Sequence, residues 1–516
     1  MRVFVFAIGG TGSRVLTSLV MQLAAGVRPK DSVGKPIHDL SIVPIIIDPH
    51  EDNSGLQQLS ELLSEYRKIH QRIYGSEVKD EGFFNVKIET LKDISPDSGV
   101  GDKFFFKMQS VTDSRFDKFI GLNDMDYFDT PANKLFAKML FSKNELETEM
   151  KEGFYGSPNI GCVALNEFKE SDDFKAFVSA YNKGDRLFFI GSIFGGTGAS
   201  GLPLFISSIR DLDSDQNNDY SGKSDCSKAP IGALIVMPYF SIAQDDSSLI
   251  NENDFIIKTR SALRYYDTSL NRYINKIYYI ADPERTADFV NDPGNINNQQ
   301  SNKYHIVEVA GALSIFDFCT ESDIDVIKDP QGRWVAQGSS SARCKAYRLR
   351  TDAGSINFEG LADQTNDLMM LPFMKFYILR NFMTKELPSM LDKSFAKDQT
   401  PRLDRSIFDN RDLKDFFAKY DQWLKEIKDH GTNAHNLDLF TVVGNDYTHA
   451  FRDKPGTKKR FLGGSKSVGV KDIQLALDDA SHKLGDMENM YKRWFTIANE
   501  ALNNVINNNY EYNNLL

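Results

Sequence analysis

The stretch VFVFAIGGTGS, residues 3–13, decides how this chain is expected to fold. It opens with an apolar run at Val3–Ile8, ends in glycines, and leads into an amphipathic stretch at Ser13–Ala25. The stretch RLFFIGSIFGGTGASG, residues 186–201, has the same form, and a helical pattern follows it at Leu202–Asp211. Each stretch predicts a buried strand that leads through a tight glycine turn into a helix.

The first 325 residues continue to alternate strand and helix patterns. Further strands are expected at Ser41–Ile47, Ile231–Tyr239 and Lys276–Ala281, and helices at Gln57–Ile73, Asn166–Tyr181, Phe255–Arg272 and Ile306–Phe318. Alternation with fully apolar strands predicts an α/β fold in which helices cover both faces of a parallel, Rossmann-like sheet. Residues 80–150 interrupt the pattern and are expected to form an insertion at one edge of the sheet.

The alternation fades beyond about residue 325. Long helical patterns at Met369–Leu391 and Ile473–Val505 predict a mostly helical region over 326–516. We also expect a strand at Leu437–Val443 and a frayed tail at Asn503–Asn514. The chain should therefore consist of a nucleotide-binding domain over 1–325, with its 80–150 insertion, and a helix-rich C-terminal region.

Composition excludes several classes of protein. The 516 residues carry a net charge of −11, which argues against a nucleic-acid partner. No run of 18 apolar residues is present, so we expect no membrane-spanning segment and no membrane partner. The four cysteines are far apart and form no CxxC pair, which is typical of reduced thiols in a cytoplasmic protein.

The first glycine loop predicts phosphate binding. Its residues are Gly9, Gly10, Thr11, Gly12 and Ser13. A strand that ends in glycines before a helix lets backbone amides approach phosphate oxygens, and the helix dipole favours the negative charge. An ordinary tight turn or a Rossmann dinucleotide site is also compatible with this loop. The dinucleotide fingerprint G-x-G-x-x-G is incomplete, because Val15 stands where its last glycine is required.

The second glycine loop contains Gly195, Gly196, Thr197, Gly198, Ala199, Ser200 and Gly201. It resembles the G-G-[GT]-G-[TS]-G signature of the tubulin/FtsZ superfamily, although Ala199 stands where the family has a hydroxyl residue. The resemblance covers roughly residues 1–320 and implies a divergent bacterial tubulin-like protein that binds GTP or GDP with Mg²⁺. Thr11, Thr197 and Ser200 would then add hydroxyl donors to the phosphate site.

Two further stretches fall where that family has nucleotide contacts. Gly156-Ser157-Pro158-Asn159-Ile160-Gly161 is similar to a phosphate loop, which assigns Gly156, Ser157 and Asn159 to the site. Asp48 ends the second predicted strand, and the resemblance implies that it orients magnesium, which accepts one or two carboxylates together with water. A plain turn at 156–161 and a solvated acidic turn at Asp48 are the alternatives.

The start of the helix expected at Ile306–Phe318 predicts base recognition. The resemblance implies that Tyr304 stacks on guanine and that Glu308, four residues later, reads the edge of the base. Spacing of four puts both side chains on one helix face. A carboxylate accepts from the N1–H and 2-amino groups of guanine, a donor pair that adenine lacks. The alternative is an ordinary exposed Tyr–Glu pair.

The resemblance weakens at the catalytic loop. Family members polarise the attacking water with acidic residues of a neighbouring subunit, and Asp323 and Asp325 lie in about the right region here without the family spacing. One hypothesis is therefore a cytoskeletal, GTP-dependent filament that hydrolyses GTP at subunit contacts. A second is a GTP-binding switch or scaffold that engages a protein through the insertion or the C-terminal helices. A third is a Rossmann-type enzyme that uses NAD or ATP.

Overall fold

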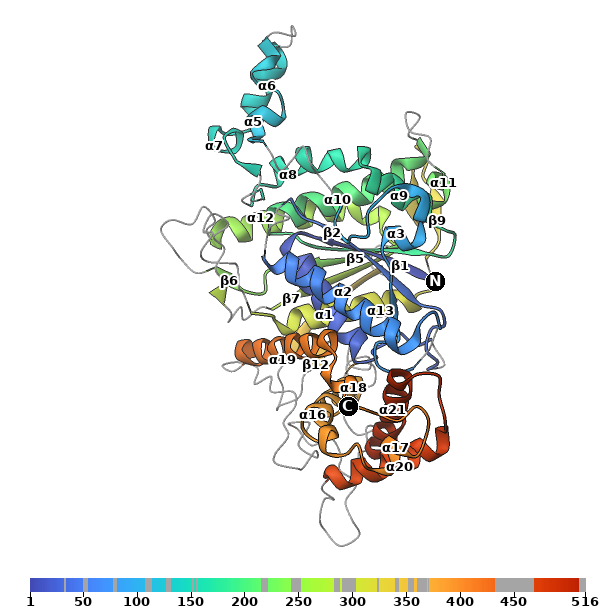
Figure 1. Cartoon of the computed structure of the whole chain (residues 1–516). Helices are drawn as coiled ribbons and strands as arrows, with labels where there is room; N and C mark the ends of the chain where they lie inside the picture. Colours follow the sequence, from blue (N-terminus) through green and yellow to red (C-terminus); the bar gives the residue numbers. More distant parts are fainter. Residues whose placement is uncertain are drawn as a thin grey trace.

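The computed structural model of the chain (Figure 1) describes residues 1–31, 34–49, 54–77, 81–106, 114–126, 131–150, 153–154, 156–214, 221–242, 252–282, 288–289, 303–322, 324–338, 343–350, 357–359, 369, 371–431 and 468–509.

A central sheet organises the molecule. Its strand order is β12-β11-β7-β5-β4-β1-β2-β3, and every pair is parallel except β11 with β12. The strands are β1 (Arg2–Ile8), β2 (Ser41–Ile47), β3 (Lys87–Ile88), β4 (Arg186–Ser192), β5 (Ile231–Val236), β7 (Lys276–Ala281), β11 (Cys344–Arg350) and β12 (Asn357–Glu359). The predicted α/β class with a parallel sheet is confirmed. Because β11 and β12 join this sheet, it extends past the boundary expected at residue 325.

Two layers of helices cover the sheet because its strands are apolar on both faces. Side chains of β1 alternate between them: Val3 and Val5 pack with α1 and α2, whereas Phe4 and Phe6 pack with α8, α9 and α10. The first layer consists of α1 (Gly9–Ala24), α2 (Ser54–Tyr74) and α13 (Ile306–Thr320). The second consists of α8 (Pro158–Ala164), α9 (Asp172–Ala180) and α10 (Gly196–Asp211), with α11 (Lys223–Cys226) and α12 (Glu252–Tyr265) nearby (Figure 1).

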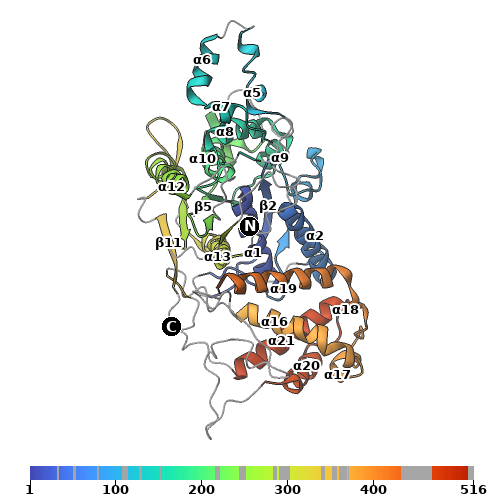
Figure 2. The ribbon, with the colours of Figure 1, turned by 90° about the vertical axis from the view of Figure 1, so that its left-hand side faces the viewer.

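The C-terminal helices lie beneath the first layer (Figure 2). They are α16 (Leu371–Lys385), α17 (Ser394–Lys397), α18 (Ser406–Asp409), α19 (Arg411–Gly431), α20 (Val470–Leu484) and α21 (Met490–Asn509). The indole N–H of Trp423 donates to Ser18 Oγ at 3.3 Å, so α19 contacts α1 directly. The predicted helical character of this region is therefore observed in its described residues. The strand expected at Leu437–Val443 lies outside them.

Several boundaries differ from expectation for local reasons. The helix expected over Ile473–Val505 is divided at Gly485, which has a φ of 69°. The helix expected over Asn166–Tyr181 begins as a 3-10 turn, and Ser171 then caps α9 by accepting from the Phe174 amide at 3.1 Å. Part of the tail expected to fray, up to Asn509, is helical in α21.

The 80–150 segment contributes to two places. Strand β3 extends the sheet beside β2, and α3 (Leu91–Ile94) follows it. Helices α5 (Phe116–Phe119), α6 (Pro131–Leu140) and α7 (Lys143–Leu146) project away from the sheet as an arm, which both views show (Figures 1 and 2). Two small two-stranded sheets complete the fold: β6 (Ser241–Ile242) with β8 (Asp288–Phe289), and β9 (Val326–Lys328) with β10 (Trp334–Ala336). Among the described residues, no helix is long and apolar enough to cross a membrane.

Candidate functional site

Three helix N-termini in the layers beside β1 and β4 lack side-chain caps. Helix α1 begins at Gly9 directly after β1, α10 begins at Gly196 soon after β4, and α8 begins at Pro158. None of the three has a side-chain cap or an acidic residue in its first turn. The first amides of a helix have no partner within it, and the helix dipole makes that end positive. All three ends are therefore suited to an anion.

The three loops lie against one another. A Cβ added at Gly9 would lie 3.3 Å from Thr197 Cβ and 3.4 Å from the Gly198 amide nitrogen. A Cβ added at Gly196 would lie 3.3 Å from the amide nitrogens of both Gly156 and Ser157. The structure thus brings the predicted loops at 9–13, 156–161 and 195–201 together at the carboxyl edge of the sheet.

The predicted loop residues divide into those that are accessible and those that are packed. The accessible or half-buried group is Gly10, Thr11, Gly156, Ser157, Asn159, Gly195 and Thr197. The buried group is Gly9, Gly12, Ser13, Gly196, Gly198, Ala199, Ser200 and Gly201. The Ser200 hydroxyl, expected to face phosphate, donates instead to the Gly196 carbonyl at 2.7 Å, and Ser13 donates to Gly9 at 3.2 Å. The side chains open to a ligand are therefore those of Thr11, Thr197, Ser157 and Asn159, beside the backbone amides of the loops.

Two of the buried glycines permit the helices to start close to the strands. A Cβ at Gly12 would lie 2.8 Å from the Ala7 carbonyl carbon, and one at Gly198 would lie 2.7 Å from the Ser192 amide nitrogen. Backbone atoms at those distances cannot move aside easily. The close packing of α1 and α10 on the strands therefore requires glycine at these two positions.

Asp48 follows β2, the neighbour of β1, and is half-buried at the same edge of the sheet. Magnesium bound with nucleotide phosphates needs only one or two protein carboxylates, because phosphate oxygens and water complete its octahedron. Within the described residues there is no group of three side chains that could hold a metal ion alone. Asp48 is therefore compatible with a phosphate-bound magnesium ion and not with a metal held by protein side chains only.

The N-terminus of α13 contrasts with the open helix ends, because its own side chains close it. His305 accepts from the Val307 amide at 3.1 Å, and Glu308 accepts from the His305 amide at 3.0 Å, which forms a capping box. Glu308 is fully buried. Its Oε1 also accepts from Arg14 Nε at 2.5 Å and from the Tyr239 hydroxyl at 2.8 Å.

Arg14 connects this network to the first glycine loop, since it lies in the second turn of α1. Its guanidinium stands 4.8 Å from the centre of the Tyr304 ring. The Tyr304 amide donates to Glu426 Oε2 of α19 at 3.0 Å. Burial raises the pKa of Glu308 above its ordinary value, whereas the adjacent guanidinium lowers it. Arg14 thus contacts both Tyr304 and Glu308. The expected shared helix face does not form, because α13 begins at Ile306 with His305 as its N-cap and Tyr304 lies before it.

The contacts of Arg14 and Tyr239 with Glu308 were not expected from the sequence. A signal for Arg14 was present, because it is the only charged residue between Val3 and Val27. A single charge in an apolar helix predicts a buried partner of opposite sign. Glu308 stands in the similarly apolar run at Ile306–Phe316, and the two lone charges form the pair.

Asp325 lies at the opposite edge of the sheet from the glycine loops. Its carbonyl accepts from the Asn275 side chain, and Asn275 immediately precedes β7, so Asp325 is at the amino edge. Helix α13 separates it from Glu308 by most of its 15 residues, about 20 Å. Asp325 therefore cannot reach the phosphate loops of its own chain. Asp323 lies outside the described residues.

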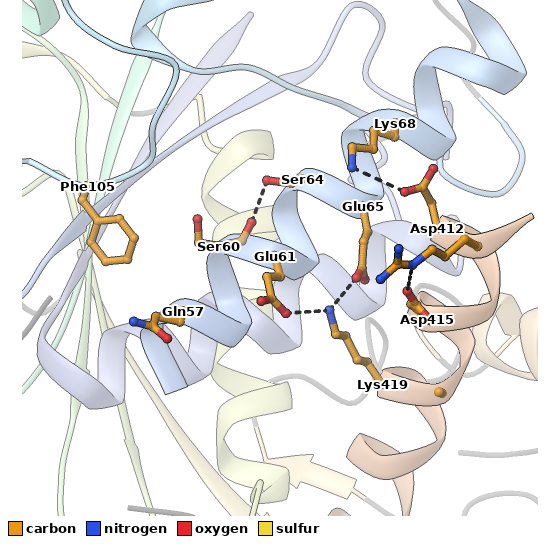
Figure 3. Close-up of a pocket in the computed structure, with 12 residues that line it drawn as sticks. Gln57, Ser60, Glu61, Ser64, Glu65, Lys68, Phe105, Asp412, Asp415 and Lys419 are labelled. Carbon is orange, nitrogen blue, oxygen red and sulfur yellow. Dashed lines mark hydrogen bonds and ion pairs between the residues drawn. The ribbon is translucent and has the colours of Figure 1, made fainter. Parts of the chain in front are cut away.

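A groove with a volume of about 910 Å³ lies between α2 and α19, and none of the glycine-loop residues lines it (Figure 3). Lys419 Nζ contacts Glu65 at 2.6 Å and Glu61 at 3.5 Å, and Arg411 contacts Asp415 at 3.4 Å. Burial raises the pKa of Glu65, and Lys419 opposes this shift. Lys419 pairs with α2 across the groove, and the Arg411–Asp415 pair lies along α19. The groove is therefore a polar contact region between α2 and the C-terminal helices.

No family model and no curated protein matches this chain. Among solved structures, it is similar to GDP-form protofilaments of TubZ from Bacillus thuringiensis serovar israelensis, with 14% identity, a TM-score of 0.21, and coverage of 64% of this chain and 56% of that one. A GTPγS-form protofilament of the same protein gives 15% identity, a TM-score of 0.20, and coverage of 64% and 57%. The chain thus matches little more than half the length of these structures. A likeness this distant supports no conclusion about ligands or assembly, and the α/β class rests on the sheet itself.

Proposed function

We propose that this chain is a tubulin/FtsZ-like protein that binds GTP or GDP, with the phosphates held by the loops at 9–13, 156–161 and 195–201. The observation that carries the proposal is the meeting of three helix N-termini, none of them capped by a side chain. One uncapped end is common. Three that converge on one place, with accessible threonines beside them, make a site for several negative charges, and this favours a polyphosphate over a single carboxylate.

Magnesium would be oriented by Asp48 from the end of β2 and would be held mainly by the phosphates. Bound magnesium would neutralise part of the phosphate charge. The chain itself contributes backbone amides, the Thr11 and Thr197 hydroxyls, and the carboxylate of Asp48 to this arrangement.

Guanine is proposed as the base because of the chemistry around Tyr304 and Glu308. Arg14 now makes the two contacts that guanine would make, since its guanidinium covers the Tyr304 ring and donates to the Glu308 carboxylate. A guanidinium group and the N1–H and 2-amino edge of guanine carry similar donor pairs. Guanine recognition at this position would thus require Arg14 to swing aside.

Competition between nucleotides tests both halves of the proposal. GTP is expected to bind more tightly than ATP or NAD, and Arg14→Ala is expected to preserve or increase that preference, whereas Glu308→Gln should reduce it. Equal binding of GTP and ATP by the wild-type chain would contradict guanine recognition and leave only the phosphate-binding part of the proposal. Preferential binding of NAD or ATP would favour the Rossmann-type alternative.

Hydrolysis, if Asp325 and Asp323 take part in it, would occur between subunits. Asp325 is at the amino edge of the sheet, about one helix length from the loops of its own chain, so it could act only on the nucleotide of a neighbouring copy. The residues would position water electrostatically, with no covalent intermediate. GTP-dependent pelleting with slow phosphate release, both lost in Asp325→Ala, is expected of such a filament.

A GTP-binding switch is the second candidate, and a specific set of contacts favours it. Helix α19 contacts the base-side network through Glu426 and Tyr304, and contacts α1 through Trp423 and Ser18. A movement of Arg14 or Tyr304 on nucleotide binding would therefore reach the C-terminal helices directly. Nucleotide-dependent proteolytic protection of that region without any pelleting across protein concentrations would select the switch over the filament.

A further inference from the structure

The arm formed by α5, α6 and α7 carries an outward apolar face that the proposed nucleotide site does not explain. Four large side chains of α6 are exposed: Leu135 is 63% exposed, Phe136 60%, Met139 76% and Leu140 53%. Nine large apolar side chains are exposed in the part of the chain that the structure describes, and these four lie within six consecutive residues. We call the four side chains the α6 patch. Their concentration marks a contact surface, because apolar side chains exposed singly are ordinary.

Helical geometry places the α6 patch on one side of the helix. Its members are three or four residues apart, a spacing that lines up side chains along one helix face. The exposed Ala132 falls on the same face, one turn before the patch. The only charged residues of α6 are Lys134 and Lys138, and a rotation of about 100° per residue places both outside this face. The α6 patch is therefore an uncharged stripe of the kind that one helix presents to another.

The opposite side of α6 already packs within the arm. Ala137 is buried, and Phe141, just after the helix, packs edge-on against Phe116 with ring centres 4.8 Å apart. The Phe141 amide donates to the Ala137 carbonyl at 2.9 Å. The arm therefore holds α6 through one face, and the α6 patch is a second face that remains exposed.

The area of the α6 patch fits a contact between two chains. Four large apolar side chains exposed to this degree offer on the order of 500 Å² of apolar surface. Apolar atoms make up about 65% of a homodimer interface, so this surface corresponds to a face of about 800 Å² in total. A stable protein interface buries about 800 Å² on each partner. The patch together with its polar surroundings is therefore large enough for one stable contact.

The charges around the α6 patch are of both signs, which favours a second copy of the chain over a partner of one charge. Residues 114–150 carry five basic and seven acidic side chains. Lys138 is exposed on α6, and Lys143 lies 4.0 Å from Glu147 just beyond it. A two-fold contact must be complementary to itself, and a rim with both signs can present opposite charges to its own copy. A strongly acidic or strongly basic partner would meet like charges over part of this rim.

We propose that two copies of this chain pair through their arms, with the α6 patch of one chain packed against the same patch of the other in a two-fold contact. The arm projects away from the sheet, so α6 can reach a second copy ahead of the body of the molecule (Figures 1 and 2). The contact uses no residue of the glycine loops, so it forms without nucleotide and does not depend on the proposed function. It also differs from the filament contact, which would bring Asp325 of one chain to the glycine loops of the next.

Sedimentation equilibrium of the full chain without nucleotide tests the pairing. The wild type should have twice the mass of one chain at about 100 µM, because interfaces of this size bind with micromolar or tighter affinity. Two double variants place like charges in the patch: Phe136→Glu with Met139→Glu, and Phe136→Lys with Met139→Lys. Each should raise the Kd of the dimer at least about tenfold, because charges are costly in an apolar contact and like charges then face each other.

Mixing the two double variants distinguishes a two-fold contact from any other use of the patch. The Glu variant and the Lys variant should associate with each other at least about tenfold more tightly than either does with itself, because carboxylates then face ammonium groups. Leu475→Glu is the matched control, because Leu475 is 53% exposed on α20, outside the arm. It should form dimers like the wild type, and thermal unfolding should show that all variants fold.

Three results would overturn the proposal. A wild type that stays monomeric at about 100 µM would show that the α6 patch does not bind a second copy. A dimer that persists unchanged in both double variants would use another surface of the chain. A mixture of the two double variants that associates no better than either alone would mean that the α6 patch meets a different surface and not itself.

Discussion

The helix N-termini at the glycine loops and the N-terminus of α13 at Glu308 differ in whether side chains cap their first backbone N–H groups. Helices α1, α8 and α10 leave their first amides without side-chain caps, whereas α13 is closed by His305 and Glu308 and by an ion pair to Arg14. A helix N-terminus with a side-chain cap is stabilised without a ligand. At an N-terminus without such a cap, a bound anion can accept hydrogen bonds from the first N–H groups. We therefore propose that nucleotide binding is concentrated at the loops, and that the α13 N-terminus is structural as long as Arg14 pairs with Glu308.

The largest expected effect is from Glu308→Ala. The change leaves Arg14 without its carboxylate, leaves the buried Tyr239 hydroxyl without its acceptor and opens the α13 cap. We expect the free energy of unfolding to fall by about 3–5 kcal/mol, measured by urea denaturation. Asp325→Ala, at an exposed position, is the control and should have little effect. A loss of less than about 1 kcal/mol for Glu308→Ala would show that the closed end is not the stabilising feature proposed here.

Gly12→Ala should have the next largest effect, because its methyl group would overlap the backbone of β1. The expected cost is about 1–3 kcal/mol of unfolding free energy. Gly10→Ala is the matched control in the same loop, since a Cβ there meets no atom within 4 Å. An equal loss in both variants would contradict the division of the loop into packed and accessible glycines.

Tyr239→Phe removes one hydrogen bond to the Glu308 carboxylate and leaves the ring in place. The expected loss of stability is about 1–2 kcal/mol, and phosphate binding should not change. Calorimetric unfolding together with nucleotide titration would measure both quantities. Tyr265→Phe, at an exposed position, provides the control. Weakened phosphate binding in Tyr239→Phe would mean that the two regions are coupled and not separate.

Thr197→Asp should have the smallest effect on stability and a large effect on binding. A carboxylate in the first turn of α10 interacts favourably with the helix dipole, so the ligand-free protein should gain about 0.3–1 kcal/mol. The same charge should repel phosphate and weaken nucleotide binding at least tenfold. Thr197→Asn has a similar shape without the charge and should bind nearly normally. Equal nucleotide affinity in the Asp and Asn variants would argue against phosphate at this helix end.

The sheet and the glycine loops could be predicted because their signals are local. Val3–Ile8 and Ser41–Ile47 are apolar runs that stop at glycine or at Asp48, and the structure ends both strands there. Strands β11 and β12 carried no comparable signal, since Cys344–Arg350 mixes charged and apolar residues and depends on β7 for its place.

The base-side network could not be predicted from local patterns. Arg14 and Glu308 are 294 residues apart, and only the packing of α1 against α13 brings them together. A spacing of four predicted one helix face for Tyr304 and Glu308, but α13 begins only after Tyr304. The spacing also carried no information about Arg14, which contacts both side chains. The hydroxyl of Ser200 was likewise expected to face phosphate because a motif does not show which way a buried side chain turns.

We propose that the open helix ends bind the phosphates of a nucleotide. Calorimetric titration of the full chain with GTP, GDP, GMP and guanosine in the presence of magnesium tests this binding most directly. We predict that affinity falls at each loss of a phosphate, that guanosine binds weakest, and that Thr197→Asp flattens the series. Guanosine that binds as tightly as GTP, or no binding of any member of the series, would contradict the claim.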